Sequence, residues 1–271
     1  SNWWWRKRNT FTCNAERYSS LRMRFLFIAL ILFTTNIFAA EMSSEKMPKH
    51  DWSFQGVTGT FDRAAIQRGY KVYREVCAGC HSMRLLYYRD LLDVGFSEAQ
   101  IKVIASEYTL LDGPNDDGEM FERPARPADK FVNPYANNNE ARANNNGAYP
   151  PDLSVITKSR KYGVDYIYNL LLGYVEPPKG MEVGNGMYYN KWMAGNQIAM
   201  PAPIADGSVD YDDGTDNNAE QLSADVTHFL QWAAEPEMEE RKNLGIKVIL
   251  FFIILGTIVY LAKNRLWRDV T

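Results

Sequence analysis

Residues 76–82 read VCAGCHS, so Cys77 and Cys80 stand two residues apart and His81 follows the second thiol directly. The whole chain of 271 residues contains only three cysteines and three histidines. The pattern C-x-x-C-H is the signature of c-type haem attachment, in which both thiols bond to the porphyrin and the imidazole binds its iron. The motif therefore predicts one haem c, covalent through Cys77 and Cys80, with His81 as an axial ligand.

Other uses of a C-x-x-C pair have less support in this sequence. A thioredoxin-like redox pair usually accompanies a βαβ pattern, and no such pattern is evident here. A zinc site needs further ligands, and the remaining histidines, His50 and His228, lack ligand-like spacing. Three cysteines are also too few for a disulfide-stapled fold of this size.

A haem iron bound by one histidine either takes a second axial group or keeps an open position, and Met or His is the usual second ligand in electron transfer. His228 lies on an apparent amphipathic helix and His50 in a polar stretch, so neither is favoured. Met200 stands in IAMPAP (198–203), where two prolines restrict the following backbone. A rigid loop of this kind suits an axial ligand, and the alternative is a packed methionine before a proline-rich turn. The other methionines after the motif are Met83, Met120, Met181, Met187, Met193 and Met238.

Two apolar segments near the ends of the chain predict a signal peptide and a transmembrane helix. Residues 25–38 follow a basic stretch and lead to Ala39 and Ala40, which predicts a secretory signal peptide within residues 1–40 rather than a membrane anchor. Residues 244–263 are long and apolar enough to cross a bilayer as a helix. Basic residues in and beside the tail, 264–271, place that tail in the cytoplasm. The haem domain, 41–243, is then periplasmic, at the inner (cytoplasmic) membrane of a bacterium.

The body of the chain reads as mainly α, a c-type cytochrome domain with long ordered loops. Apolar residues recur with a helical period after Asp62, which can cap a helix that runs into Cys77. Further helices are predicted at 97–107, 163–174 and 221–233, the last with a start near Leu222. No alternating strand series is evident, and the Asn-rich run 137–146 is equally compatible with a flexible polar loop.

The charge balance excludes a nucleic-acid partner and favours a cationic one. The formal net charge is −3, and the residues after the predicted signal peptide carry 24 basic and 32 acidic side chains, or −8. Two acidic groups stand out, although each could simply be a solvated loop. The first contains Asp206, Asp210, Asp212, Asp213, Asp216 and Glu220, and the second contains Asp112, Asp116, Asp117 and Glu119.

Several longer motifs together resemble the cytochrome c1 family, the haem c subunit of ubiquinol–cytochrome c reductase (the cytochrome bc1 complex, complex III). The segments that carry the resemblance are RGYKVY (68–73), CAGCHSM (77–83), DGPNDDGEMF (112–121), NNGAYPPDLS (145–154), GYVEPP (173–178), IAMPAP (198–203), YDDGT (211–215) and FLQWAAEPE (229–237). They cover most of the chain.

The resemblance implies a role and a set of haem contacts. Met200 would be the second axial ligand, and Arg160 would pair with a haem propionate, because guanidinium groups suit carboxylates. The other expected haem contacts are Asn145, Ala148, Pro150, Pro151 and Tyr166. The implied partners are cytochrome b, a Rieske iron–sulfur protein that donates electrons, a soluble cytochrome c that accepts them, and membrane lipid. The chain would act as an electron relay without a catalytic residue of its own.

The competing functions are a membrane-tethered electron carrier outside any complex, a haem enzyme or gas sensor with an open iron site, and a disulfide oxidoreductase.

Overall fold

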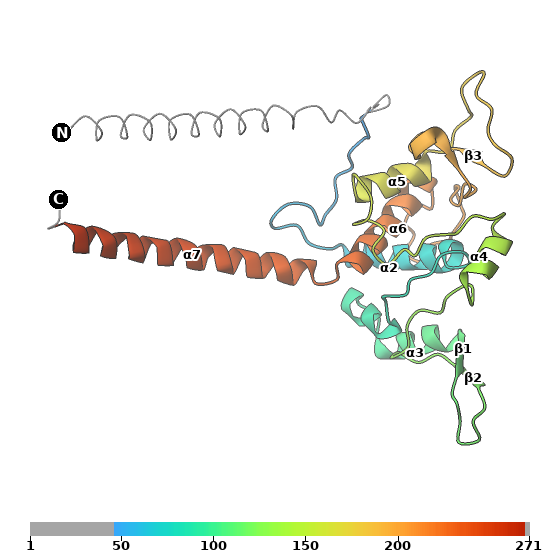
Figure 1. Cartoon of the computed structure of the whole chain (residues 1–271), viewed down its shortest axis with the longest axis horizontal. Coiled ribbons are helices and arrows are strands. Elements are labelled where there is room, and N and C mark those ends of the chain that lie inside the picture. Colours follow the sequence, from blue (N-terminus) through green and yellow to red (C-terminus); the bar gives the residue numbers. More distant parts are fainter. Residues whose placement is uncertain (1–45, 269–271) are drawn as a thin grey trace, which may run out of the picture. The chain divides into compact units, whose positions relative to one another are not determined.

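The computed structural model describes residues 46–268. The predicted signal peptide therefore lies outside the described residues. The elements are α2 (Arg63–Val72), the π-helix η1 (Tyr73–Cys77), the 3₁₀ helix η2 (Tyr88–Val94), α3 (Glu98–Ser106), β1 (Thr109–Asp112), β2 (Phe121–Pro124), α4 (Asn138–Asn144), α5 (Val164–Leu172), β3 (Tyr188–Tyr189), the 3₁₀ helix η3 (Ala194–Asn196), β4 (Gln197–Ile198), α6 (Ala219–Ala234) and α7 (Met238–Trp267). Figure 1 shows a mainly helical body with long connecting loops, as the sequence predicts.

Local capping residues explain where the predicted helices begin. The Asp62 carboxylate accepts from the backbone N–H of Ala65 at 3.1 Å and starts α2. Ser97 and Gln100 form a reciprocal capping box at the start of α3. Helix α6 begins earlier than predicted, because Asn218 rather than a residue near Leu222 caps it.

Two segments that the sequence analysis treated as loops contain regular secondary structure. The Asn-rich run contains α4, because the Asn137 side chain accepts from the backbone N–H groups of Asn139 and Glu140 and nucleates a helix. Residues 109–124 contain an antiparallel hairpin of β1 and β2, which projects from the body in Figure 1. Its strands are only four residues long and neither buries a full face: β1 alternates between exposed and half-buried, and β2 is exposed at three of its four residues. They therefore leave a weak strand pattern in the sequence.

The centre of the core is the crossing of α2 and α6, where Ile66 and Phe229 are fully buried. Arg68 reaches across it and donates from Nε and Nη2 to the two carboxylate oxygens of Asp225, at 2.8 and 3.0 Å. Asp225 is 1% exposed, so this bidentate pair supplies the partner that a buried carboxylate requires. Burying each large apolar side chain here contributes about 2 kcal/mol.

Gly69 permits this close crossing, and Gly69→Ala should disrupt it. An alanine Cβ at this position would lie 2.0 Å from the Asp225 carbonyl oxygen on α6, and backbone cannot move as a flexible side chain does. We expect a loss of roughly 3 kcal/mol, the upper part of the usual range for overpacking, seen as a lower melting temperature of the detergent-extracted protein. Gly245→Ala is the matched control, because no atom lies within 4 Å of its added Cβ. Equal melting temperatures for the two variants would show that the close approach of α2 and α6 at Gly69 does not determine the stability of the fold.

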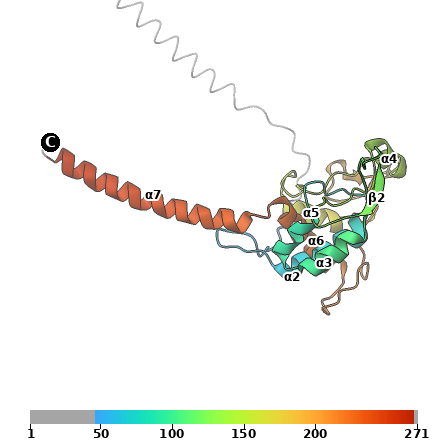
Figure 2. The same cartoon turned by 90° about the horizontal axis from the view of Figure 1, so that it is seen from below.

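Helix α7 leaves the body as one long apolar rod, seen from two directions in Figures 1 and 2. It has 30 residues, and among the described helices it alone is long and apolar enough to cross a membrane. Its apolar side chains are exposed all round, with Phe251 59% and Ile254 61% exposed, which excludes a buried core helix. The helix thus fits a single-pass membrane anchor and begins six residues before the predicted span.

Candidate functional site

The backbone after α2 projects Cys77, Cys80 and His81 from one turn. The α-helix gives way to the π-turn η1, in which the Ala78 N–H donates to the Tyr73 carbonyl at 2.8 Å. The N–H groups of Cys80 and His81 then both donate to the Cys77 carbonyl, at 3.1 and 2.9 Å. Both cysteines are free thiols, and Cys80 is exposed. The motif is therefore compact and accessible from one side.

The π-turn is a functional detail that the sequence pattern did not reveal. Such turns occur often at functional sites because one extra residue per turn changes the direction of the side chains that follow. Tyr73 fixes the turn: its ring is buried, and its hydroxyl donates to the His81 carbonyl at 3.3 Å. The helical period of the apolar residues continues through this region, so periodicity alone could not distinguish a π-turn from an α-helix.

His81 is oriented so that Nε2 of its ring can bind a metal. Its Nδ1 lies 2.8 Å from the Pro151 carbonyl oxygen, and because that oxygen can only accept, Nδ1 carries the proton. Burial lowers the pKa of His81, which favours the neutral ring. Nε2 is then a free lone-pair donor in a fixed orientation, the arrangement usual for a metal-binding histidine.

Hydrogen bonds hold the predicted contact segment 145–154 against the motif. The Asp152 carboxylate accepts from the Ser82 hydroxyl at 2.8 Å and from the Arg84 backbone N–H at 2.9 Å. The Leu153 N–H donates to the Ser82 carbonyl at 2.9 Å. These bonds place exposed Pro151 beside His81, and half-buried Pro150 lies next to it in the chain.

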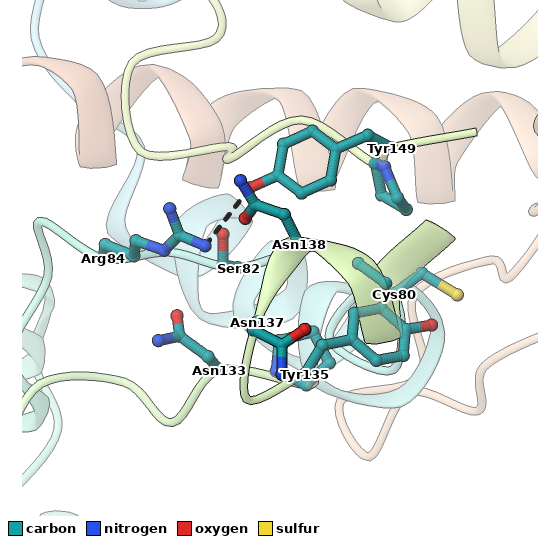
Figure 3. A pocket seen from close by; sticks show the side chains of 11 residues that line it. Cys80, Ser82, Arg84, Asn133, Tyr135, Asn137, Asn138 and Tyr149 are labelled. Atoms are coloured by element: carbon teal, nitrogen blue, oxygen red, sulfur yellow. Dashed lines mark hydrogen bonds between the residues drawn. The ribbon is translucent and has the colours of Figure 1, made fainter. Parts of the chain in front are cut away.

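A small groove lies beside Cys80, and Figure 3 shows the side chains that line it. Cys80 stands at one end, and at the other Arg84 donates to the Tyr149 hydroxyl at 3.3 Å. Asn145 joins this region through its amide, which donates to the Tyr135 hydroxyl at 3.0 Å and to the Ala141 carbonyl at 2.7 Å. The free volume of the groove is only about 10 Å³, which is the room that one water molecule needs, so the groove holds no larger ligand in this structure. Its lining residues are Cys80, Ser82, Arg84, Asn133, Pro134, Tyr135, Asn137, Asn138, Ala141, Tyr149 and Pro150.

Met200 is half-buried and follows β4 in the loop that the prolines restrict. The Tyr174 hydroxyl donates to its carbonyl at 3.1 Å, which fixes the backbone and leaves the thioether unused by that contact. Other methionines are engaged elsewhere. Met83 and Met238 are buried in the core, and Met120 is exposed on the hairpin. Met181 and Met187 are half-buried in the loop before β3.

The remaining predicted haem contacts are Tyr166, Arg160 and Ala148. Tyr166 donates its hydroxyl to the Met193 sulfur at 3.4 Å, so it lies beside a methionine, although not the predicted one. Arg160 is exposed, and its guanidinium donates to the carbonyl and hydroxyl of the neighbouring Ser159, each at 3.3 Å. Half-buried Ala148 donates its N–H to the Asn145 carbonyl. The hydrogen bonds and ion pairs of the described residues do not connect Met200, Tyr166 or Arg160 to His81.

The chemistry of these donors fits a haem and disfavours the rival readings of the motif. Two free thiols and a lone-pair nitrogen on one turn match covalent attachment with axial ligation. Burial raises the pKa of the Cys77 thiol to about 12, whereas redox-active C-x-x-C pairs depend on a low thiol pKa. Within residues 46–268, no three His, Cys, Asp or Glu side chains gather as a possible metal site.

Comparisons with known proteins identify relatives along nearly the whole described chain. A family model described as "Cytochrome C1 family" matches residues 52–270. The protein "Cytochrome b/c1" of Bradyrhizobium diazoefficiens is 46% identical over 263 residues, which cover 89% of this chain but only 38% of that protein. "Cytochrome c1-1, heme protein, mitochondrial" of Solanum tuberosum is 47% identical, with 88% of this chain and 74% of the relative covered. "Cytochrome c1" of Rhodospirillum rubrum is 44% identical, with 82% and 88% covered.

Proposed function

This chain belongs to the cytochrome c1 family, and we propose on that basis that it is the haem-containing electron-transfer subunit of a cytochrome bc1 complex. Within ubiquinol–cytochrome c oxidoreductase it would receive electrons from a Rieske iron–sulfur protein and pass them to a soluble cytochrome c. The name of the Bradyrhizobium relative joins cytochrome b with cytochrome c1, which supports cytochrome b as a neighbour.

One haem c is proposed to attach through Cys77 and Cys80, with His81 and Met200 as its axial ligands. The observation that carries this proposal is the hydrogen bond from His81 Nδ1 to the Pro151 carbonyl, because it leaves Nε2 unprotonated and aims it. The competing thioether of Met193 already accepts a hydrogen bond from Tyr166, which makes Met200 the better donor in this region.

When bound, the haem supplies reversible one-electron chemistry at its iron. The residues of the chain would set the conditions for it. His81 would provide a neutral imidazole held in one orientation, and the Met200 thioether would raise the reduction potential of a haem held there. Arg160, which is exposed and donates to Ser159, would pair with a propionate, because guanidinium groups suit carboxylates. Asn145, Ala148, Pro150, Pro151 and Tyr166 would form the wall that excludes water. No proton transfer or nucleophile is required of this chain, so no residue is assigned a catalytic role.

The proposed topology follows from α7. The helix would cross a bacterial inner membrane once, with the basic tail 264–271 in the cytoplasm and the haem domain 41–243 in the periplasm. That side of the membrane suits both covalent haem attachment and a diffusible electron acceptor.

The acidic loop between β4 and α6 is proposed to steer a basic cytochrome c. Several of its carboxylates also serve the fold: Asp213 accepts from Arg68 at 3.1 Å, and Asp206 accepts from the Ala219 backbone N–H. Asp212 accepts from Lys71 at 3.0 Å, yet its side chain is 92% exposed. Asp212, Asp216 and Glu220 therefore contribute negative potential at the surface with little cost to the fold if neutralised.

The triple variant Asp212→Asn, Asp216→Asn and Glu220→Gln should slow reduction of a basic cytochrome c about tenfold at low ionic strength. The difference should disappear at high salt, because screening removes long-range attraction. Stopped-flow kinetics of the intact complex measure both rates. The exposed carboxylates Asp93, Glu98 and Glu182 provide a matched triple amide control. An unchanged rate at low salt would eliminate this steering role.

Purification in mild detergent tests the proposed assembly. Cytochrome b and a Rieske protein should co-purify with this chain, and the preparation should reduce cytochrome c with ubiquinol. A coloured chain that purifies alone and is never reduced through a Rieske protein would instead favour the independent tethered carrier.

A further inference from the structure

The junction between α6 and α7 contains a set of contacts that the proposed electron-transfer function does not explain. Helix α6 ends at Ala234 and α7 starts at Met238, so only Glu235, Pro236 and Glu237 join the haem domain to its anchor. A single short linker would allow the domain to pivot on the membrane helix. The contacts around the first turn of α7 oppose such a pivot.

Glu239 is the centre of these contacts. Its Oε1 accepts from the Phe61 backbone N–H at 2.7 Å and from Arg63 Nη1 at 2.6 Å, while its Oε2 accepts from Arg63 Nη2 at 2.8 Å. Both the bidentate geometry and the charged donor strengthen these bonds. They tie α7 to the start of α2, which leads directly to Cys77.

Lys242 makes a second attachment one turn later. Its Nζ donates to the carbonyl oxygens of Phe54 and Gly59, at 2.6 and 2.8 Å. The loop that presents these carbonyls is tight, because an added Cβ on Gly59 would lie 1.9 Å from the Gln55 carbonyl oxygen. Met238, which starts α7 and is 3% exposed, belongs to the hydrophobic core.

The segment that receives α7 is itself fastened to the rest of the domain. The His50 N–H and the Trp52 indole N–H both donate to Asp165 on α5, at 3.1 and 2.8 Å. Trp52 and Phe54 pack edge-on against His228 of α6, with ring centroids 5.2 and 5.3 Å apart. Residues 47–61 thus form a strap that contacts α5, α6 and α7.

We propose that Glu239 and Lys242 clamp α7 to the strap, so that the haem domain and its anchor move as one rigid body and the domain keeps a fixed angle to the membrane. Both are positioning residues: they touch no expected haem contact. The clamp would hold the haem domain at a constant height and orientation relative to α7.

Distance measurements on the full-length chain in lipid nanodiscs test the clamp. Nitroxide labels carried by non-natural amino acids at Asn139, on α4, and Ile253, within α7, avoid all thiols and do not depend on haem attachment. The unmodified chain should give one narrow distance distribution. Glu239→Gln and Lys242→Met should each raise the population of other distances at least about tenfold, because each weakens or removes charge-assisted hydrogen bonds and the loss of one such bond alone accounts for about that factor. The double variant should raise it further.

Glu107→Gln is the matched control, since it breaks the Arg74–Glu107 ion pair away from the anchor and should leave the distribution narrow. Near-ultraviolet circular dichroism confirms that each variant keeps its aromatic core. If Glu239→Gln does not fold, Lys242→Met decides the question, because it removes only a side-chain amine. A narrow distribution in a folded Lys242→Met or double variant would overturn the clamp, whatever the haem content of the chain.

Discussion

Met200→Leu should open the sixth coordination position of the haem. Leucine has a similar volume, so the half-buried site should keep its fold at a cost below about 1.5 kcal/mol. Without the thioether, the reduced protein should bind carbon monoxide, which the unmodified protein should resist. The reduction potential should fall by on the order of 0.1 V or more, because a methionine ligand raises it and axial ligands set potentials over a wide range. Absorption spectra under carbon monoxide and a redox titration measure both effects.

Met193→Leu is the control that makes this test specific. It removes a thioether in the same region, one that accepts a hydrogen bond from Tyr166 at 3.4 Å. This variant should keep a carbon monoxide-resistant haem and a nearly unchanged potential. If Met193→Leu binds carbon monoxide while Met200→Leu does not, the axial assignment is wrong and belongs to Met193. If the unmodified protein already binds carbon monoxide, the open-site haem enzyme or sensor is the better function.

Replacing both motif cysteines, Cys77→Ser with Cys80→Ser, should abolish stable haem binding. With both thioether bonds lost, His81 and Met200 alone would hold the porphyrin, and haem could dissociate into the periplasm. We expect no haem to remain with the chain on a denaturing gel stained for haem peroxidase activity. Ubiquinol–cytochrome c reductase activity of the membranes should fall to background.

Cys13→Ser is the matched control for this double variant. Cys13 precedes the predicted cleavage site and lies outside the described residues, so its loss should leave both the haem stain and the activity unchanged. A haem stain that survives in the Cys77→Ser, Cys80→Ser chain would mean that the haem is attached through other atoms.

The predictable parts of this protein are those set by local chemistry. Asp62 predicts the start of its helix because a side-chain oxygen at an N-cap is a local signal. The apolar run of α7 predicts an anchor because composition alone decides membrane solubility. The motif around His81 predicts its ligand role because attachment needs a fixed spacing within one turn.

Features that depend on distant partners could not be predicted in this way. Helix α4 is an exception, because its Asn137 cap is local. The Asn-rich run does not predict the helix, since asparagine favours turns and loops as well as N-caps. The bond from His81 to Pro151 joins residues 70 positions apart, and the ion pair of Arg63 with Glu239 joins residues 176 apart. Neither has a periodic or local pattern. The haem contacts Ala148, Pro150 and Tyr166 were predicted from family resemblance, and their role stays a prediction, because the contacts of these side chains in the structure do not themselves define a haem surface.

The most direct test of the account is the state of the two motif thiols in the purified, unmodified chain. Acid acetone extracts non-covalent haem, so after extraction and denaturation the chain should remain coloured, and its mass should exceed that of the polypeptide by one haem. Thiol titration should find neither Cys77 nor Cys80 reactive. A colourless chain with the bare polypeptide mass and two free motif thiols would contradict the account.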